Sequence, residues 1–251
     1  MVRLDRALVD RGLVRSRQQA VELIAAGLVR VNDVVAVRAA APVEAADRLS
    51  AQTDHYVSRA AHKLLGALED LGLAVAGRAL DAGASTGGFT QVLLERGCSE
   101  VVAIDVGTDQ LAPLLRSDVR VTSHEQTNLR DLELSHLGGK LVDLVVADVS
   151  FISLTLLVGP LSGVVRPDGA MLLMIKPQFE VGRERLSKGG VVRSPELHRA
   201  AIAAVTDAAR GCGWFAQQVV PSRLPGPAGN QEFFAVFRTV PPAQAPHLDL
   251  R

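Results

Sequence analysis

From Arg78 onward, short apolar runs alternate with segments in which apolar residues recur at helical spacing. The runs have the length of buried strands and comprise 79–84, 100–106, 119–123, 141–148 and 170–176. Helical spacing covers 90–96, 152–165 and 196–210. A strand that is apolar on both faces must be covered on both faces. The alternation therefore predicts a Rossmann-like α/β fold, an open and mostly parallel sheet with helices on each side.

The last two apolar runs, 214–221 and 232–238, follow one another without a helix between them. Pro225, Gly226 and Pro227 lie in the connection and favour a turn. We therefore expect an antiparallel hairpin at one edge of the sheet, which is unlike the end of a dehydrogenase half-sheet.

The first fifty residues carry a different pattern. Apolar spacing predicts one helix that Gly12 ends and a second that runs from Ser16 to Gly27. Ser16 and Gln19 have the spacing of a capping box, in which the serine caps the helix and the glutamine reaches back. Asn32-Asp33 lies between two short apolar runs and predicts a tight hairpin. Together these elements predict a small α+β module.

Residues 51–56 are polar and without periodicity, so they are interpreted as a linker. We expect one domain of residues 1–56 and a second of residues 57–240. Residues 241–251 are expected to form a disordered tail.

Lys plus Arg and Asp plus Glu both total 27, so no bulk positive field draws the whole molecule to nucleic acid. The N-terminal thirty residues are nevertheless locally basic. Their candidate RNA-binding side chains are Arg3, Arg11, Arg15, Arg17, Gln18 and Arg30. Arg15, Arg17 and Gln18 converge on a helix N-terminus, which attracts phosphate. From charge alone, a solvated arginine-rich face is an equally good interpretation.

The two cysteines, Cys98 and Cys212, are far apart in sequence and lack metal-binding spacing. They indicate a reducing compartment and neither a zinc site nor a disulfide scaffold. The N-terminus lacks the apolar stretch of a secretory signal, and every long apolar run is interrupted. We expect a cytoplasmic protein with no membrane partner and no required metal. A monomer is expected because no heptad pattern or large apolar face is visible.

A glycine-rich loop, from Asp81 to Phe89, follows the first strand of the predicted sheet. Its candidate cofactor-binding residues are Asp81, Gly83, Ser85, Thr86 and Gly87. Glycine lets the backbone approach a ligand closely, although a glycine-rich turn without a ligand is the alternative.

Further candidates follow the next two strands. Asp105 ends the second strand, where an acid can accept both hydroxyl groups of a ribose. Asn128 follows the third strand and is either a contact for an adenine edge or part of a surface turn. NAD and S-adenosylmethionine both suit this arrangement. The dinucleotide fingerprint is absent, because Ser85 stands where its second glycine would lie, and this favours a nucleoside without a diphosphate.

Only four of the 27 basic residues are lysines, and one of them ends a strand. Lys176 follows the apolar run 170–175, and Asp148 ends the neighbouring run. Both are expected to reach the ligand crevice, which lies beyond the carboxyl ends of parallel strands. A buried amine can lose its proton whereas a guanidinium cannot, so Lys at this place suggests chemistry. An ordinary charged residue at a strand end is the alternative for each.

Four segments carry a specific resemblance: 59–64, 147–153, 176–180 and 229–234, which read RAAHKL, ADVSFIS, KPQFE and GNQEFF. They resemble motifs of FtsJ-type ribose methyltransferases, with Lys63, Asp148, Lys176 and Glu232 in place of that family's Lys-Asp-Lys-Glu tetrad. The N-terminal module is similar to a small RNA-binding module of ribosomal proteins and pseudouridine synthases. Nearly the entire chain thus resembles the TlyA family, which is often labelled haemolysin-like.

This resemblance implies a class I methyltransferase sheet and methyl transfer from S-adenosylmethionine to ribose 2'-hydroxyls. The implied substrates are cytidines of 16S and 23S ribosomal RNA, within ribosomal subunits. It further implies that Lys176 is the base, that Asp148 and Glu232 orient it, and that Lys63 positions the hydroxyl or a phosphate. Lys63 as the base stays open.

Two aromatic residues near these motifs, Phe89 and Phe151, are expected to pack in the core rather than to stack on a base. The basic segment 183–190 is either a substrate lid or a solvated loop. Three alternative functions remain: a non-catalytic ribosome-binding factor, a membrane-active haemolysin and a nicotinamide oxidoreductase.

Overall fold

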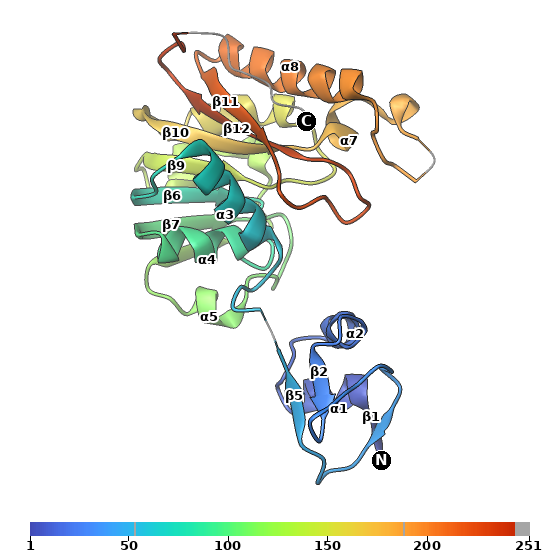
Figure 1. The fold of residues 1–251 in the computed structure, drawn as a ribbon. Helices are drawn as coiled ribbons and strands as arrows, with labels where there is room; N and C mark the ends of the chain where they lie inside the picture. The colour runs from blue at the N-terminus through green and yellow to red at the C-terminus, as the bar shows by residue number, and fades with distance from the viewer. Residues whose placement is uncertain (53, 188, 244–251) are drawn as a thin grey trace. The chain divides into compact units, whose positions relative to one another are not determined.

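The structure is a computed structural model that describes residues 1–52, 54–187 and 189–243 (Figure 1). The chain divides into two compact units, Met1–His55 and Tyr56–Arg251. Residues 244–251 of the expected tail lie outside the described residues.

The second unit is built on one seven-stranded sheet in the order β11-β12-β10-β9-β6-β7-β8 (Figure 1). Its strands are β6 (Gly77–Ala82), β7 (Cys98–Ile104), β8 (Val121–His124), β9 (Val142–Ala147), β10 (Val165–Ile175), β11 (Phe215–Pro221) and β12 (Phe233–Arg238). The five strands from β8 to β10 are parallel, whereas β12 is antiparallel to both β10 and β11. The predicted Rossmann-like sheet with an antiparallel edge hairpin is confirmed, and the last strand of the chain inserts beside β10.

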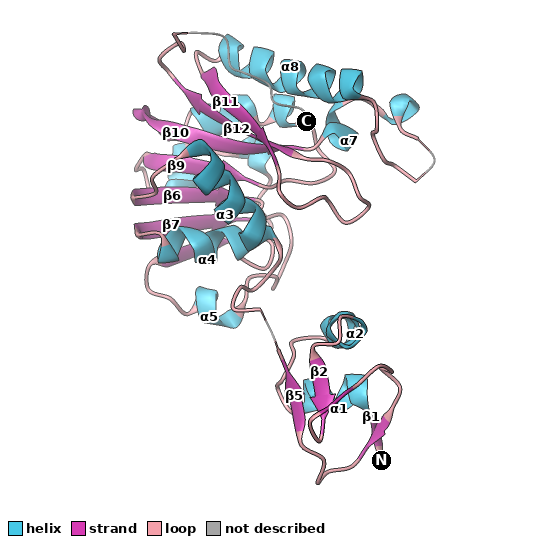
Figure 2. Ribbon diagram, viewed as in Figure 1, coloured by secondary structure: helices cyan, strands magenta, loops and turns pink. Residues whose placement is uncertain are grey.

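Helices cover both faces of this sheet (Figure 2). One face packs against α3 (Ala60–Leu71) and α4 (Gly88–Glu95), next to the short α5 (Pro113–Arg116). The other face packs against α6 (Val158–Ser162) and α8 (Pro195–Gly211). Remaining short helices are α7 (Pro177–Glu180), η1 (Leu129–Asp131), η2 (Leu134–Leu137), η3 (Leu154–Leu156) and η4 (Arg183–Arg185). None of the helices in the described residues is both long and apolar enough to cross a membrane.

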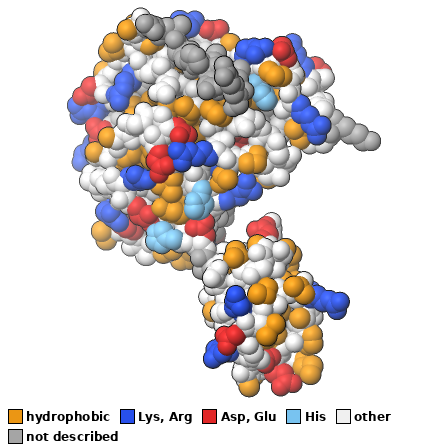
Figure 3. All heavy atoms as spheres, viewed as in Figure 1, with side chains coloured by type: hydrophobic (Ala, Val, Ile, Leu, Met, Phe, Trp, Pro, Cys, Tyr) orange, Lys and Arg blue, Asp and Glu red, His pale blue; other side chains and the backbone are white. Residues whose placement is uncertain are grey.

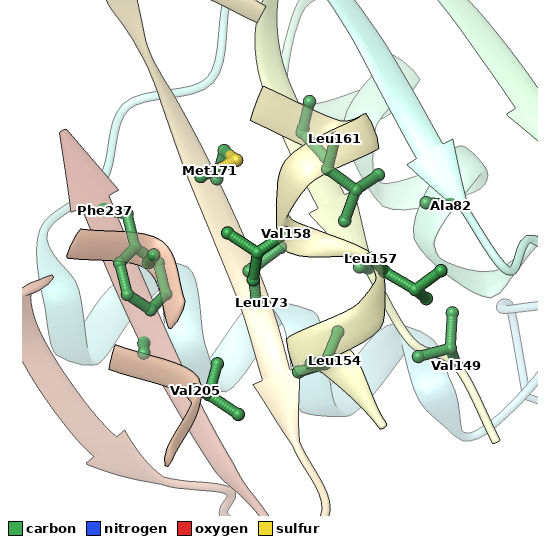
Figure 4. Close-up of a cluster of buried hydrophobic side chains, with 14 of the residues drawn as sticks. Ala82, Val149, Leu154, Leu157, Val158, Leu161, Met171, Leu173, Val205 and Phe237 are labelled. Carbon is green, nitrogen blue, oxygen red and sulfur yellow. The ribbon is translucent and has the colours of Figure 1, made fainter. Parts of the chain in front are cut away.

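The predicted helix 152–165 is wrong in its extent. The structure has η3 and then only five residues of α6 before β10 begins at Val165. Pro160 lies in the first turn of α6, where its missing N–H needs no partner, and it excludes a helix that starts much earlier. Leu154, Leu157, Val158 and Leu161 still form one apolar stripe against the sheet (Figure 4).

The first unit is a small α+β module, as predicted. It contains β1 (Val2–Arg3), α1 (Leu4–Asp10), α2 (Arg17–Ala25), β2 (Val29–Val31), β3 (Val34–Val35), β4 (Pro42–Val43) and β5 (Leu49–Ala51). Asn32 and Asp33 both have positive φ, 49° and 69°, in the turn between β2 and β3. These residue types tolerate that region, so the predicted hairpin forms without glycine.

The capping of α2 is confirmed for Ser16 and different for Gln19. Ser16 Oγ accepts a hydrogen bond from Gln19 N at 3.1 Å. Gln19 Oε1 instead accepts from Arg15 N at 2.8 Å, one residue before the cap. The side chain therefore orders the approach to the helix rather than closing a capping box.

Candidate active site

Side-chain alternation along the strands determines where the predicted acids and amines lie. The cluster that packs under α3 and α4 includes Leu144 and Val146 of β9, Leu172 and Met174 of β10, and Phe234 and Val236 of β12. Two residues further toward the carboxyl edge of the parallel strands, the same face carries Asp148, Lys176 and Glu232. The strand pattern therefore directs all three toward the N-terminal part of α3.

Strand register brings these residues side by side. Ile175 pairs with Phe233 across β10 and β12, so Lys176 and Glu232 are the next residues outward on adjacent strands. Leu173 pairs with Ala147, which places Asp148 just beyond β9 and next to β10.

The four predicted catalytic residues form two ion pairs at this edge. Lys176 Nζ lies 2.6 Å from Asp148 Oδ1 and donates a hydrogen bond to Ser150 Oγ at 2.8 Å. Lys63 projects from α3 and pairs with Glu232, and both of these side chains are buried. Charges that leave water require such partners, because an unpaired buried charge is strongly unfavourable.

Two hollows lie beside the pair of Lys176 and Asp148. The larger has a volume of about 500 Å³, which is typical of pockets for small ligands. Four of the predicted cofactor residues line it: Gly83, Ser85, Asp105 and Asn128. Its apolar walls include Leu129, Ile152 and Leu157.

The smaller hollow, of about 230 Å³, lies beside Lys176 and is also lined by Arg59 and Thr86. The two hollows share Gly83, Ser85, Asp148 and Ser150 as lining residues, so they meet at these loops. Two ligands, one in each hollow, would therefore meet beside Asp148 and Lys176.

The glycine-rich loop is held between the carboxylate of Asp105 and the backbone of Asp148. Asp105 accepts hydrogen bonds from Ser85 N at 2.8 Å and from Gly107 N at 2.7 Å. Gly83 has a φ of 85°, and a Cβ there would lie 2.7 Å from the carbonyl oxygen of Asp148. Only glycine therefore allows this loop to pack directly on the backbone that carries Asp148.

Two predicted cofactor residues, Asp81 and Gly87, line neither hollow. Asp81 is fully buried below the loop and accepts a hydrogen bond from Thr90 Oγ1 of α4 at 2.6 Å. Burial raises the pKa of Asp81 to about 7. Gly87 caps α4 with a φ of 94°, where a Cβ would collide with Leu115 and Leu111. Both residues support the loop from beneath.

The two phenylalanines differ. Phe89 is buried at 3% exposure, as predicted, but the prediction for Phe151 is wrong because its side chain is 91% exposed. Phe151 has a φ of 65°, a strained conformation for a bulky residue, and this turns its side chain away from the core. Its ring lies 5.2 Å from that of Phe179, centroid to centroid.

Sequence reasoning also missed Ser150 and Gln110. Ser150 contacts Lys176 and borders both hollows, and Gln110 lines the larger one. Ser150 lies two residues after Asp148, and this proximity was the available signal. Gln110 lies in the loop after β7, and no sequence pattern marked it as a site residue.

Several of the RNA-binding candidates in the first unit have partners within that unit. Arg3 and Arg17 both contact the buried carboxylate of Asp5, at 3.0 and 2.8 Å. Their hydrogen bonds hold the pKa of Asp5 well below its usual range. Arg11 donates to the carbonyl oxygens of Glu44, Ala45 and Asp47, so it ties that loop to α1.

The remaining candidates are Arg15, Gln18 and Arg30. Arg30 donates to the carbonyl oxygen of Asp33 at 2.9 Å, and Gln18 donates to Glu22 at 3.1 Å. Arg15 and Gln18 are exposed and lie at the start of α2, and Arg30 is exposed on β2. On the face seen in Figure 3, basic and acidic side chains are interspersed on this unit.

Comparison with known families matches both units. Residues 56–239 match the FtsJ-like methyltransferase family, and residues 2–49 match the S4 domain. A curated relative, the 16S/23S rRNA (cytidine-2'-O)-methyltransferase TlyA of Mycobacterium tuberculosis, is 52% identical over 241 residues. The match covers 94% of this chain and 90% of the relative.

Solved structures agree with this assignment. A suspected hemolysin from Streptococcus thermophilus has 36% identity and a TM-score of 0.76, covering 99% of this chain and 90% of its own. An S-adenosylmethionine-dependent methyltransferase from Mesorhizobium loti has 16% identity and a TM-score of 0.51, covering 70% and 97%. The second likeness shows the fold alone.

Proposed function

This chain belongs to the FtsJ-like methyltransferase family, and we propose that it methylates ribose 2'-hydroxyls of cytidines in 16S and 23S ribosomal RNA. It is an S-adenosylmethionine-dependent methyltransferase with an N-terminal S4 domain for RNA. The observation that supports the proposed chemistry best is the ion pair of Lys176 with Asp148, which borders the junction of the two hollows.

The larger hollow suits the cofactor. When bound, S-adenosylmethionine supplies a methyl group that is activated by a positively charged sulfur. Asp105, at the end of β7, would hold its ribose hydroxyls, and Gly83 allows close approach of the backbone. Leu129 and Asn128 would contact the adenine. S-adenosylmethionine has no diphosphate, so the loop needs no pyrophosphate-binding glycine at the position of Ser85.

Lys176, in its neutral amine form, is the proposed base that takes the proton from the ribose hydroxyl and becomes an ammonium paired with Asp148. Its side chain lines the smaller hollow, whereas Lys63 lines neither. This difference favours Lys176 over Lys63 for the role. Asp148 and Ser150 hold the amine in place, because both contact its Nζ. General-base catalysis by a positioned side chain contributes about 10²- to 10⁴-fold.

Lys63 and Glu232 are proposed to act as a supporting pair. Glu232 contacts Lys63 rather than Lys176 in the structure, so it orients the second lysine and not the base directly. Glu232 balances the charge of Lys63 and holds this buried ammonium in one position. The proposed contact of Lys63 with a substrate phosphate has no support from the hollows, because Lys63 does not line them.

Residues 1–56 are proposed to bind the RNA, and residues 57–240 to transfer the methyl group. Similarity to an enzyme of ribosomal RNA supports ribosomal subunits as substrate and a cytoplasmic location. We propose that the enzyme acts as a monomer, since each catalytic residue comes from one chain. Light scattering of the purified protein tests that state.

The test of function is a labelling experiment with three substrates. The purified chain would be incubated with methyl-labelled S-adenosylmethionine and with small subunits, large subunits or free ribosomal RNA. We expect label on the 2'-oxygen of cytidines, mapped by resistance of the adjacent phosphodiester to alkali. Cofactor binding without transfer to any substrate would instead support a non-catalytic ribosome-binding factor.

A membrane-active role is the second candidate, favoured by the description of relatives such as the Streptococcus thermophilus protein as hemolysins. Release of dye from liposomes by the purified protein would support it. We expect no release at concentrations that saturate methyl transfer.

A further inference from the structure

The loop of residues 148–153, here called the β9 loop, forms part of both hollows. It follows β9 and carries Asp148 and Ser150, which line the two hollows together. It also carries Phe151 in a strained backbone conformation, with a φ of 65° and 91% of its side chain exposed. Such strain persists only where the surrounding structure holds the segment in place.

Contacts with one short segment, residues 176–180, hold this loop. Lys176 Nζ donates to Ser150 Oγ at 2.8 Å, and the ring of Phe179 lies against that of Phe151. At the end of the loop, Ser153 Oγ donates to Glu180 Oε2 at 2.5 Å. Leu154 N donates to Glu180 Oε1 at 2.9 Å.

Glu180 is therefore the residue that fixes the far end of the β9 loop. Both of its oxygens accept hydrogen bonds from the loop and from the start of η3. Hydrogen bonds to a carboxylate are about twice as strong as those between neutral groups. Glu180 is half-buried, and its burial raises its pKa while the two bonds oppose that change.

The position of Glu180 in sequence connects the two halves of the candidate site. It lies four residues after Lys176 at the end of α7, and it contacts the loop five residues after Asp148. Any displacement of the loop relative to α7 would therefore alter the contact between Ser150 and Lys176.

We propose that Glu180 is a positioning residue for methyl transfer, which fixes the β9 loop to α7 and so keeps Ser150 on the Lys176 amine. This inference rests on the proposed function. Glu180 lines neither hollow, so it acts through the loop and not on a substrate.

Two substitutions at Glu180 separate the hydrogen bonds from the charge. Glu180→Gln keeps an acceptor for Leu154 N and an amide that can donate to Ser153 Oγ. Glu180→Ala removes both contacts. We expect kcat, measured at saturating RNA and S-adenosylmethionine, to fall at least about tenfold in Glu180→Ala. Glu180→Gln should stay within about threefold of the wild type.

The matched control is Glu196→Ala. Glu196 also accepts from a neighbouring serine, Ser194 Oγ at 2.6 Å, but it is exposed at the start of α8 and lines neither hollow. Its substitution should leave kcat unchanged. Urea unfolding followed by the fluorescence of Trp214, the chain's single tryptophan, confirms that each variant is folded under assay conditions.

A double-mutant cycle with Ser150→Ala distinguishes positioning from a general loss of stability. If Glu180 acts by holding Ser150, then Glu180→Ala should cost little further activity once Ser150 is alanine. If the losses of kcat in the two single variants multiply in the double variant, or if Glu180→Ala keeps the wild-type kcat, the inference is overturned. An inactive wild type would refute the proposed function instead.

Discussion

Lys176 Nζ lies 2.6 Å from Asp148 Oδ1, at the ends of the neighbouring parallel strands β10 and β9. Parallel pairing puts the carboxyl ends of both strands at one edge of the sheet, and side-chain alternation puts both residues on one face. The ion pair thus follows directly from the topology, and it borders the smaller hollow.

The first prediction concerns the base. Lys176→Ala should lower methyl incorporation by about 10²- to 10⁴-fold, because no other amine lines the smaller hollow in the described part of the chain. Binding of S-adenosylmethionine, measured by calorimetry, should persist. Lys176→Arg should not restore activity, since a guanidinium keeps its proton.

Lys140→Ala is the matched control for that experiment. Lys140 is exposed and lies outside both hollows, so its loss should not change turnover. Retained turnover in Lys176→Ala would show that another group takes the proton.

The second prediction concerns the buried pair of Lys63 and Glu232. Glu232→Ala leaves the Lys63 ammonium buried without its partner, which should lower the free energy of unfolding by about 3 kcal/mol. Urea unfolding followed by Trp214 fluorescence measures this change. The double variant Lys63→Met/Glu232→Leu should regain most of the stability, because it buries no charge, while methyl transfer stays impaired. If the double variant has the same activity and stability as the wild type, the pair has a purely structural role.

The sequence alone was sufficient to predict the position of those candidate site residues that lie at the ends of parallel strands. Asp148, Lys176 and Asp105 follow apolar runs, and parallel strands place such residues at one edge. Lys63 and Glu232 followed only from the family resemblance. Their contact joins residues 169 positions apart, and no local pattern carries that information.

The error at Phe151 has a local physical cause. Phe151 was expected in the core because of its place after a strand, but a positive φ turns it outward, and single-sequence patterns do not reveal that backbone conformation. The assignment of Asp81 to the cofactor, made from its place in the loop motif, stays a prediction, although Asp81 lines neither hollow. Its strand position, two residues after the buried Ala79, already indicated the face covered by α4, where it is buried.

The third prediction concerns the cofactor hollow. Asp105→Ala should weaken binding of S-adenosylmethionine by about 10- to 100-fold, through loss of charge-assisted hydrogen bonds and of support for the Ser85 turn. Calorimetry with the cofactor alone measures the change. Asp109→Ala is the control, because Asp109 is largely exposed and outside both hollows. Similar weakening in both variants would contradict a specific role for Asp105.

The fourth prediction concerns pH and Asp81. Folding raises the pKa of this carboxyl from 3.8 to about 7, mainly because of burial. Between these values the unfolded chain has lost the proton that the folded protein still holds, so the contribution of Asp81 to stability falls as pH rises. Asp81→Asn cannot titrate and keeps an acceptor for Thr90 Oγ1.

The stability of Asp81→Asn relative to the wild type should therefore increase from about pH 4 to pH 7, by at most about 4 kcal/mol, and then level off. Urea unfolding at several pH values, followed by Trp214 fluorescence, gives this difference. Other groups titrate in the same range, but they cancel between the two proteins. A difference that does not vary with pH would show that Asp81 is ionised in the folded state throughout.

The fifth prediction separates two arginines of the first unit. Arg30 donates to the carbonyl oxygen of Asp33 in the neighbouring turn, whereas Arg11 donates to three carbonyl oxygens of the loop 44–47. Arg30→Ala should weaken RNA binding and reduce the slope of log affinity against log salt by about 0.7 to 0.9, the value for one phosphate contact. Arg11→Ala should instead increase hydrogen exchange in residues 42–48, since it removes the tie that orders them. If Arg11→Ala changes the salt slope and leaves exchange unaltered, Arg11 contacts phosphate and its carbonyl contacts are dispensable.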